Sequence, residues 1–127
     1  MTDEITLTLP RDRDFYGIAH LVLGGLAARL DLTFEALEDL QLALASVLER
    51  PDDEGDVVVS LRVHERAVEA LVGPFELASL RTYLEREGAD ELSVARLLAT
   101  VVDSVEIDER DGGAWIALTK AVNGELH

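Results

Sequence analysis

Hydrophobic residues recur along the chain with two different periods, which predict strands and helices. Residues 5–9 and 56–64 alternate apolar and polar side chains, as half-buried strands do. Residues 12–30 and 33–50 carry apolar side chains at steps of three and four, as amphipathic helices do. The predicted order is strand, helix, helix, strand, strand, helix, helix, strand, strand, over residues 5–9, 12–30, 33–50, 56–64, 67–72, 76–87, 92–102, 104–108 and 114–119.

The helix predicted at 33–50 has the clearest limits. Thr33 can cap its free N–H groups, Glu35 lies where the helix dipole favours negative charge, and Pro51 ends it. Its apolar side comprises Leu37, Leu40, Leu44, Val47 and Leu48. This side should pack against a sheet.

The helix predicted at 12–30 should bury a stripe of large apolar residues. That stripe comprises Phe15, Ile18, Leu21, Val22, Leu26 and Leu30. Gly24 and Gly25 interrupt the helix and should each weaken it by about 1 kcal/mol relative to alanine. Glycines at such positions indicate a close backbone approach, either to the sheet or to a second copy of the chain.

Strands gathered with helices on one face predict a two-layer α/β sandwich. We expect a mixed, mostly antiparallel sheet of about five strands, because two of the strand pairs read as hairpins at 56–72 and 104–119. Gly73 and Pro74 should end the third strand, and Gly88 the third helix. A length of 127 residues fits a single domain spanning 1–127.

The net charge of −15 limits the partners that the chain can attract. Such a field repels nucleic acids and anionic membranes, and it complements a protein partner with a basic surface. The chain has no cysteine, which excludes disulfides and thiolate zinc sites, and its three histidines lack ligand spacing. The acidic start and the lack of a long apolar run favour a cytoplasmic protein.

Two segments resemble the histidine-kinase-like ATPases, in the branch of bacterial anti-sigma factor serine kinases. Asp39-Leu-Gln-Leu-Ala-Leu-Ala-Ser-Val-Leu-Glu-Arg50 is similar to the first nucleotide-binding helix of that family, and residues 95–118 are similar to its last helix and hairpin. The predicted element order also matches. The resemblance implies a Bergerat-type fold, ATP with magnesium as the ordinary cofactor, and self-association through the first helix and the sheet edge.

The catalytic positions of that family carry other residues here. Its helix motif places a glutamate as general base and an asparagine as magnesium ligand, and these positions fall on Ser46 and Arg50. A serine hydroxyl without an adjacent base is a poor proton acceptor, and a guanidinium has no lone pair for a metal. We therefore expect no catalytic residue, with Ser46 at the vacated base position, and no metal site.

The other parts of the family's pocket are also altered. The adenine-binding Asp-x-Gly-x-Gly corresponds to residues 71–76, which lack an aspartate before Gly73. No glycine occurs between Gly88 and Gly112, where a phosphate-binding lid would lie. The positions of the degenerate pocket are Asp39, Ala43, Ser46, Arg50 and Gly73. No cofactor is expected on this interpretation; the alternative is ATP with magnesium.

These observations favour a non-catalytic regulatory module that binds a protein. The resemblance implies a sigma factor or an anti-sigma antagonist as the partner, and a homodimer as the assembly. The first alternative is an active ATP-dependent protein-serine kinase, which leaves the question of enzymatic activity open. The second is a small-molecule sensor that uses the emptied cavity.

Overall fold

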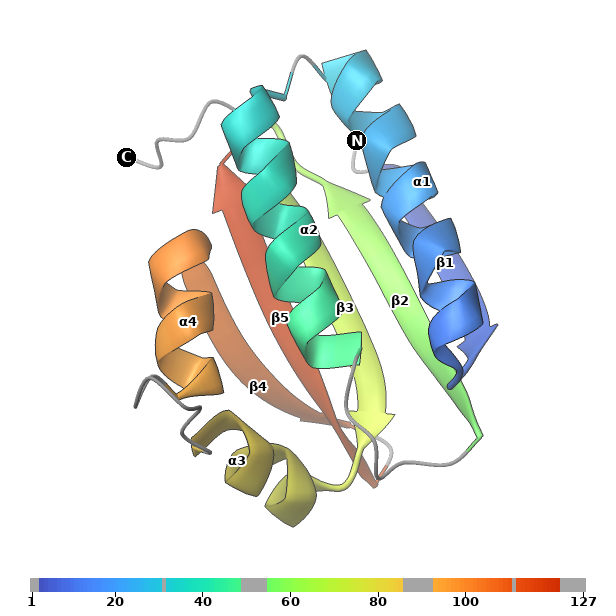
Figure 1. The fold of residues 1–127 in the computed structure, drawn as a ribbon, viewed down its shortest axis with the longest axis vertical. Coiled ribbons are helices and arrows are strands. Elements are labelled where there is room, and N and C mark those ends of the chain that lie inside the picture. The colour runs from blue at the N-terminus through green and yellow to red at the C-terminus, as the bar shows by residue number, and fades with distance from the viewer. Residues whose placement is uncertain (1–2, 31, 49–54, 86–92, 111, 122–127) are drawn as a thin grey trace.

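A computed structural model describes five segments of the chain, residues 3–30, 32–48, 55–85, 93–110 and 112–121. Its elements are β1 (Asp3–Pro10), α1 (Arg13–Leu30), α2 (Phe34–Leu48), β2 (Asp56–Val63), β3 (Ala67–Phe75), α3 (Leu77–Glu85), α4 (Val94–Val101), β4 (Ser104–Arg110) and β5 (Gly113–Ala121). The described helices lie together on one face of the sheet (Figure 1). Pro51 and Gly88, the expected helix ends, lie outside the described residues.

The described strands form one antiparallel sheet in the order β1-β2-β3-β5-β4. This arrangement confirms the predicted two-layer sandwich of helices on a five-stranded sheet. The expected end of β3 at Gly73 is wrong, because the strand continues and Phe75 pairs with Ala114 of β5. A shift in register between Val72 and Phe75 accommodates Pro74, which has no N–H to give to a ladder.

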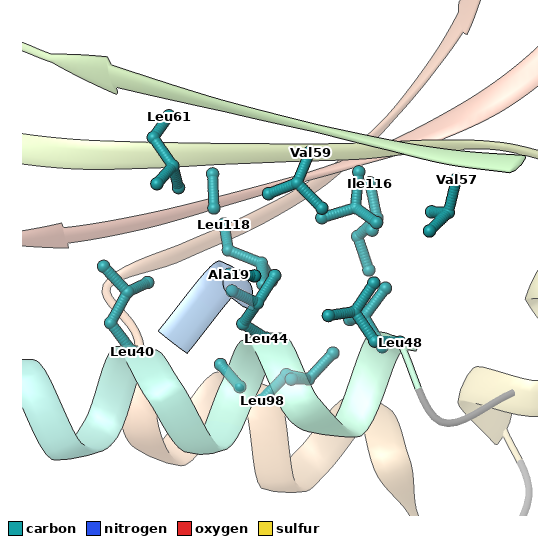
Figure 2. Close-up of a cluster of buried hydrophobic side chains, with 14 of the residues drawn as sticks. Ala19, Leu40, Leu44, Leu48, Val57, Val59, Leu61, Leu98, Ile116 and Leu118 are labelled. Atoms are coloured by element: carbon teal, nitrogen blue, oxygen red, sulfur yellow. The ribbon is translucent and has the colours of Figure 1, made fainter. Parts of the chain in front are cut away.

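The core lies between α2 and the middle strands, as the pattern of α2 predicts. Figure 2 shows Leu40, Leu44 and Leu48 pointing from α2 toward the sheet, where the core-facing residues of β2 and β5 meet them. The Thr33 hydroxyl caps this helix by accepting a hydrogen bond of 3.1 Å from the N–H of Ala36. Hydrophobic burial on one side therefore holds α2 to the sheet.

The buried side of α1 differs from the predicted one. Its buried residues are Ala19, Leu23, Leu26 and Ala27. Val22 and Leu30 are partly buried against the core, so the prediction holds for Leu26 and in part for these two. Phe15, Ile18 and Leu21 are exposed, at 39%, 42% and 78%. Residues 15–28 contain no charge, so apolar side chains surround the helix and their spacing could not select the inward side.

The glycines of α1 do not mediate a close approach to the sheet. A Cβ atom added to Gly17, Gly24 or Gly25 would meet no heavy atom within 4 Å outside the local helix backbone. Of the two alternatives for these glycines, the approach to the sheet is therefore wrong. Within the described segments, no helix is both long enough and apolar enough to cross a membrane.

Candidate functional site

Three of the five expected pocket positions lie on one helix. Asp39, Ala43 and Ser46 follow one another along α2 at steps of four and three, which places them on one side. Ala43 has no exposed surface and belongs to the hydrophobic core. Arg50, the fourth position, lies outside the described residues.

Asp39 is paired with a buried lysine. Lys120 on β5 donates hydrogen bonds to Oδ2 of Asp39, at 3.0 Å, and to the carbonyl oxygen of Val101 at the end of α4, at 2.9 Å. Only 8% of the surface of Lys120 is exposed, and it is the only lysine of the chain. The pair therefore joins α2, α4 and β5 at one point.

Sequence reasoning missed this junction, although the alternation of β5 carries a signal for it. Ile116 and Leu118 face the core, and Lys120 falls on the same face two residues later. A charge at such a position requires a partner, because an unpaired buried ammonium is costly.

The hydroxyl of Ser46 is bonded within its own helix. Its Oγ donates to the carbonyl oxygen of Leu42 at 2.9 Å, and the carbonyl oxygen of Ser46 accepts a hydrogen bond of 2.6 Å from the Tyr83 hydroxyl of α3. Among the described residues, no histidine or carboxylate bonds Ser46 Oγ. Nothing in this part of the chain therefore activates the hydroxyl as a base or nucleophile.

Leucines of three helices meet between α2, α3 and α4. Leu44, Leu80 and Leu98 are completely buried members of one cluster, and Leu48 and Leu84 are nearly so. Figure 2 shows Leu44 and Leu98 on facing elements. Buried leucines therefore form the centre of this region, beside the hydrogen bond from Tyr83 to Ser46 and the junction at Lys120.

The described side chains of the motif do not fit a magnesium ion. Asp39 supplies the one carboxylate among them, and Lys120 already holds it. In the part of the chain that the structure describes, no three carboxylates or histidines are grouped as metal ligands. A hard cation such as magnesium requires several oxygen ligands around it.

Gly73 lies apart from the three positions on α2. Its neighbour Val72 is completely buried in the core, so Gly73 is on the opposite, helix-free face of the sheet. There the ring of Trp115 occupies the place of a side chain, since a Cβ at Gly73 would lie 2.6 Å from Cδ2 of that ring. The structure therefore assigns Gly73 a packing role beneath Trp115.

A shallow hollow occurs at the turn between β4 and β5, away from α2. It has a volume of about 280 Å³ and is lined by Leu77, Glu109, Arg110, Gly112 and Gly113. None of the expected pocket positions lines it. The small-molecule alternative placed its ligand between the helices and the sheet, so this hollow does not support it.

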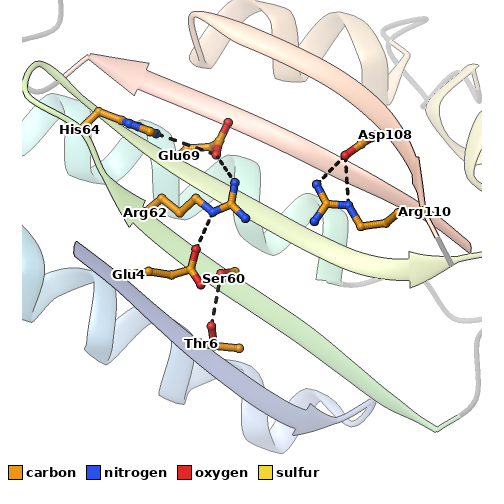
Figure 3. Close-up of polar contacts among 8 residues, drawn as sticks. All are labelled: Glu4, Thr6, Ser60, Arg62, His64, Glu69, Asp108 and Arg110. Carbon is orange, nitrogen blue, oxygen red and sulfur yellow. Dashed lines mark hydrogen bonds and ion pairs between the residues drawn. The ribbon is translucent and has the colours of Figure 1, made fainter. Parts of the chain in front are cut away.

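The helix-free face of the sheet carries a row of polar contacts (Figure 3). Arg62 contacts Glu4 and Glu69, His64 lies 3.9 Å from Glu69, and Arg110 pairs with Asp108. The hydrogen bond that Arg62 donates to the Glu4 carboxylate is the main reason that the pKa of Arg62 is raised. Such exposed pairs contribute little to stability.

A layer of helices on one side of a five-stranded antiparallel sheet, with the motif helix at its centre, is the fold of the histidine-kinase-like ATPases. No protein-family model matches the chain. Over 97% of its length, the chain is 28% identical to the serine-protein kinase RsbW of Bacillus velezensis and to that of Bacillus subtilis, covering 88% of each. It is 27% identical to the RsbW of a Listeria monocytogenes strain, covering 90% of that protein. The chain is therefore similar, over nearly its full length, to members of the anti-sigma factor serine-kinase branch of this family.

Proposed function

We propose that this chain is a regulatory protein-binding module without kinase chemistry, whose partner is a sigma factor or an anti-sigma antagonist. The observation that carries the proposal is the state of Ser46, which occupies the base position of the motif. Its hydroxyl donates to Leu42 and has no described base beside it. A serine in this state cannot take the proton of an attacking hydroxyl at neutral pH.

The environment of Asp39 supports the same proposal. Its carboxylate, the one acidic group among the described motif positions, bonds the ammonium of Lys120. Arg50 at the metal position would add a second cation rather than a ligand. On this proposal no cofactor is required, and the motif helix has a structural task.

The charge of the chain indicates the kind of surface that the partner presents. A net charge of −15 attracts a basic protein surface and repels nucleic acid, so the module would act on a regulator rather than on DNA. We place this activity in the cytoplasm, where transcription regulators are found. Electrostatic complementarity of this kind raises association rates and selects among partners.

We further propose a homodimer that forms through α1. The exposed side chains of Phe15, Ile18 and Leu21 lie in the uncharged stretch 15–28 of α1, beside glycines that leave open space. Apolar surface of this kind on a folded protein marks an interaction site. Because residues 15–28 carry no charge, a second copy would meet less repulsion there than on the acidic remainder of the chain.

The second candidate is an active protein-serine kinase that uses ATP and magnesium. It is favoured by the relatives, which are named serine-protein kinases and align with nearly the full length of this chain. In that case other residues would replace the missing base and metal ligand.

Calorimetric titration with magnesium and ATP, together with a phosphorylation assay on a candidate antagonist, separates the two. We expect neither saturable binding nor serine phosphorylation by the native chain. The double variant Ser46→Glu with Arg50→Asn restores the family's residues, and Ala45→Glu with Arg50→Asn is its matched control. Saturable binding and phosphate transfer by the native chain would overturn the proposal in favour of the kinase.

The identity of the partner requires a separate experiment. The chain is immobilised, exposed to an extract of its own cell, and the retained proteins are identified by mass spectrometry. Recovery of a transcription regulator with a basic surface supports the proposal. Recovery of metabolic enzymes alone would argue against a role in sigma-factor control.

A further inference from the structure

β4 is an outer strand of the sheet, at the opposite margin from β1 (Figure 1). It pairs with β5 on one side, and no described strand pairs with its other side. The residues from Glu106 to Arg110 are all exposed. The outer edge of β4 therefore offers backbone N–H and C=O groups that an added strand could bond.

From Val105 to Asp108, the side chains of β4 alternate between apolar and acidic, and Glu109 and Arg110 follow. Ile107 lies opposite Ile116, which is completely buried beneath the helices, so Ile107 is on the helix side of the sheet. Glu106 and Asp108 flank it and therefore lie on the helix-free face. Ile107 is 36% exposed despite its apolar side chain. Asp108 forms an ion pair with Arg110, whereas Glu106 forms no ion pair with a described residue.

We infer that the outer edge of β4 accepts an extended segment of the protein partner, in which basic and apolar side chains alternate. In such strand addition the main chain supplies hydrogen bonds, and alternate side chains select the sequence. Lysine or arginine side chains of the segment would face Glu106 and Asp108. Its apolar side chains would cover Ile107. Because the segment belongs to the partner proposed above, the inference rests on that proposed function.

A second copy of the chain is a poor occupant of the same edge. If two β4 strands paired about a two-fold axis at Ile107, Glu106 of each copy would lie directly opposite Asp108 of the other. Like charges directly opposite each other destabilise a strand pair. This register, centred on the exposed Ile107, therefore disfavours a second copy, whereas the charge of Glu106 and Asp108 fits a basic strand.

The other outer strand lacks this combination. On the helix-free face of β1, Glu4 is paired with Arg62, and the Thr6 hydroxyl lies 3.3 Å from that of Ser60. The acidic charge of this edge is thus already engaged by its neighbour β2. A basic segment should therefore bind the edge of β4 in preference to the edge of β1.

Binding of a short peptide tests this inference on the intact chain. The probe is a seven-residue peptide with blocked ends that alternates lysine and valine, and the control peptide has the same composition with its lysines consecutive. We expect hydrogen exchange of the β4 amides to slow in the presence of the alternating peptide. The double variant Glu106→Lys with Asp108→Lys should weaken its binding about tenfold or more, since two attractive charges become repulsive. Glu38→Lys with Glu65→Lys changes the net charge equally at exposed sites away from β4, and should retain affinity within about threefold.

Each result supports or contradicts binding of the segment at the outer edge of β4. Equal binding of the two peptides, slowed exchange in another strand, or equal affinity of the two double variants would overturn the inference. The partner recovered from cells is then tested on the same variants. If it binds the native chain and the β4 variant equally, the edge assignment fails while the proposed function stands. If no regulator binds but the peptide still protects β4, the proposed function fails instead.

Discussion

The two long helices, α1 and α2, are both rich in apolar residues, yet the structure uses them differently. In α2, Leu40 and Leu44 are completely buried against the sheet. In α1, smaller residues such as Ala19 face inward, and Leu21 is 78% exposed. Hydrophobicity in α2 thus holds the fold together, whereas in α1 a large part of it remains available for contact. The comparison shows that apolar content alone does not reveal which side of a helix faces the core.

Truncating one leucine on each helix is the strongest way to break this comparison. Leu44→Ala should lower the free energy of unfolding by about 2–5 kcal/mol, because it leaves a cavity in a closed core. Leu21→Ala, the matched variant on α1, should change it by less than about 0.5 kcal/mol. Urea unfolding followed by circular dichroism measures both. Equal losses would show that Leu21 is buried in the folded protein as Leu44 is.

The glycines allow a second test of the same contrast. Gly73→Ala should lower the free energy of unfolding by about 1–3 kcal/mol, because the new methyl group displaces the Trp115 ring. Gly25→Ala lies in a helix with open space around it and should raise stability by about 0.5–1 kcal/mol. The sign of the change, read from thermal unfolding at low protein concentration, distinguishes the two sites. A stabilised Gly73→Ala would contradict the contact with Trp115.

The ion pair between Lys120 and Asp39 of α2 should contribute less to the free energy of unfolding than the leucines of α2 do. Lys120→Met removes the hydrogen bonds to Asp39 and Val101 but keeps most of the buried hydrocarbon, so we expect a loss of about 1–2 kcal/mol. Arg62→Met on the exposed face, the control for an ion pair, should cost less than about 1 kcal/mol. Chemical denaturation of both variants provides the measurement. A larger loss of stability for Arg62→Met would show that the exposed ion pair contributes more to folding than the buried one.

A charge at the exposed Leu21 of α1 should have the smallest effect on folding and the greatest effect on dimer formation. Leu21→Glu places a charge on the exposed face of α1, and the stability of the monomer should change by less than about 0.5 kcal/mol. The proposed dimer should dissociate, because a carboxylate would be buried in an apolar contact. Sedimentation equilibrium compares it with Leu42→Glu, at an exposed leucine of α2. If both variants remain in the native assembly, the dimer does not use α1.

The sequence predicted most of the fold because most elements have one apolar side. Such a pattern predicted β2 to within one residue, since the strand runs from Asp56 to Val63, and its prediction for the buried side of α2 is confirmed. The inward side of α1 could not be predicted, because its apolar residues extend around the helix. The continuation of β3 past Pro74 was also missed, since a local shift in register leaves no clear trace in the pattern.

Less of the candidate site could be predicted. The motif correctly indicated the family and placed Asp39 and Ser46 on one side of a helix. The lysine that holds Asp39 lies 81 residues away in sequence, and spacing within a helix carries no information about it. Gly73 was grouped with α2 by motif, whereas the pleat of β3 turns it to the other face.

The burial of Lys120 also affects the chemical reactivity of the molecule. Acylating reagents and lysine-modifying enzymes need an accessible, uncharged amine, and the single lysine side chain of this protein is enclosed by two acceptors at the junction of α2, α4 and β5. Labelling of that amine therefore requires the junction to open. Its rate would serve as a built-in reporter of how often these three elements separate.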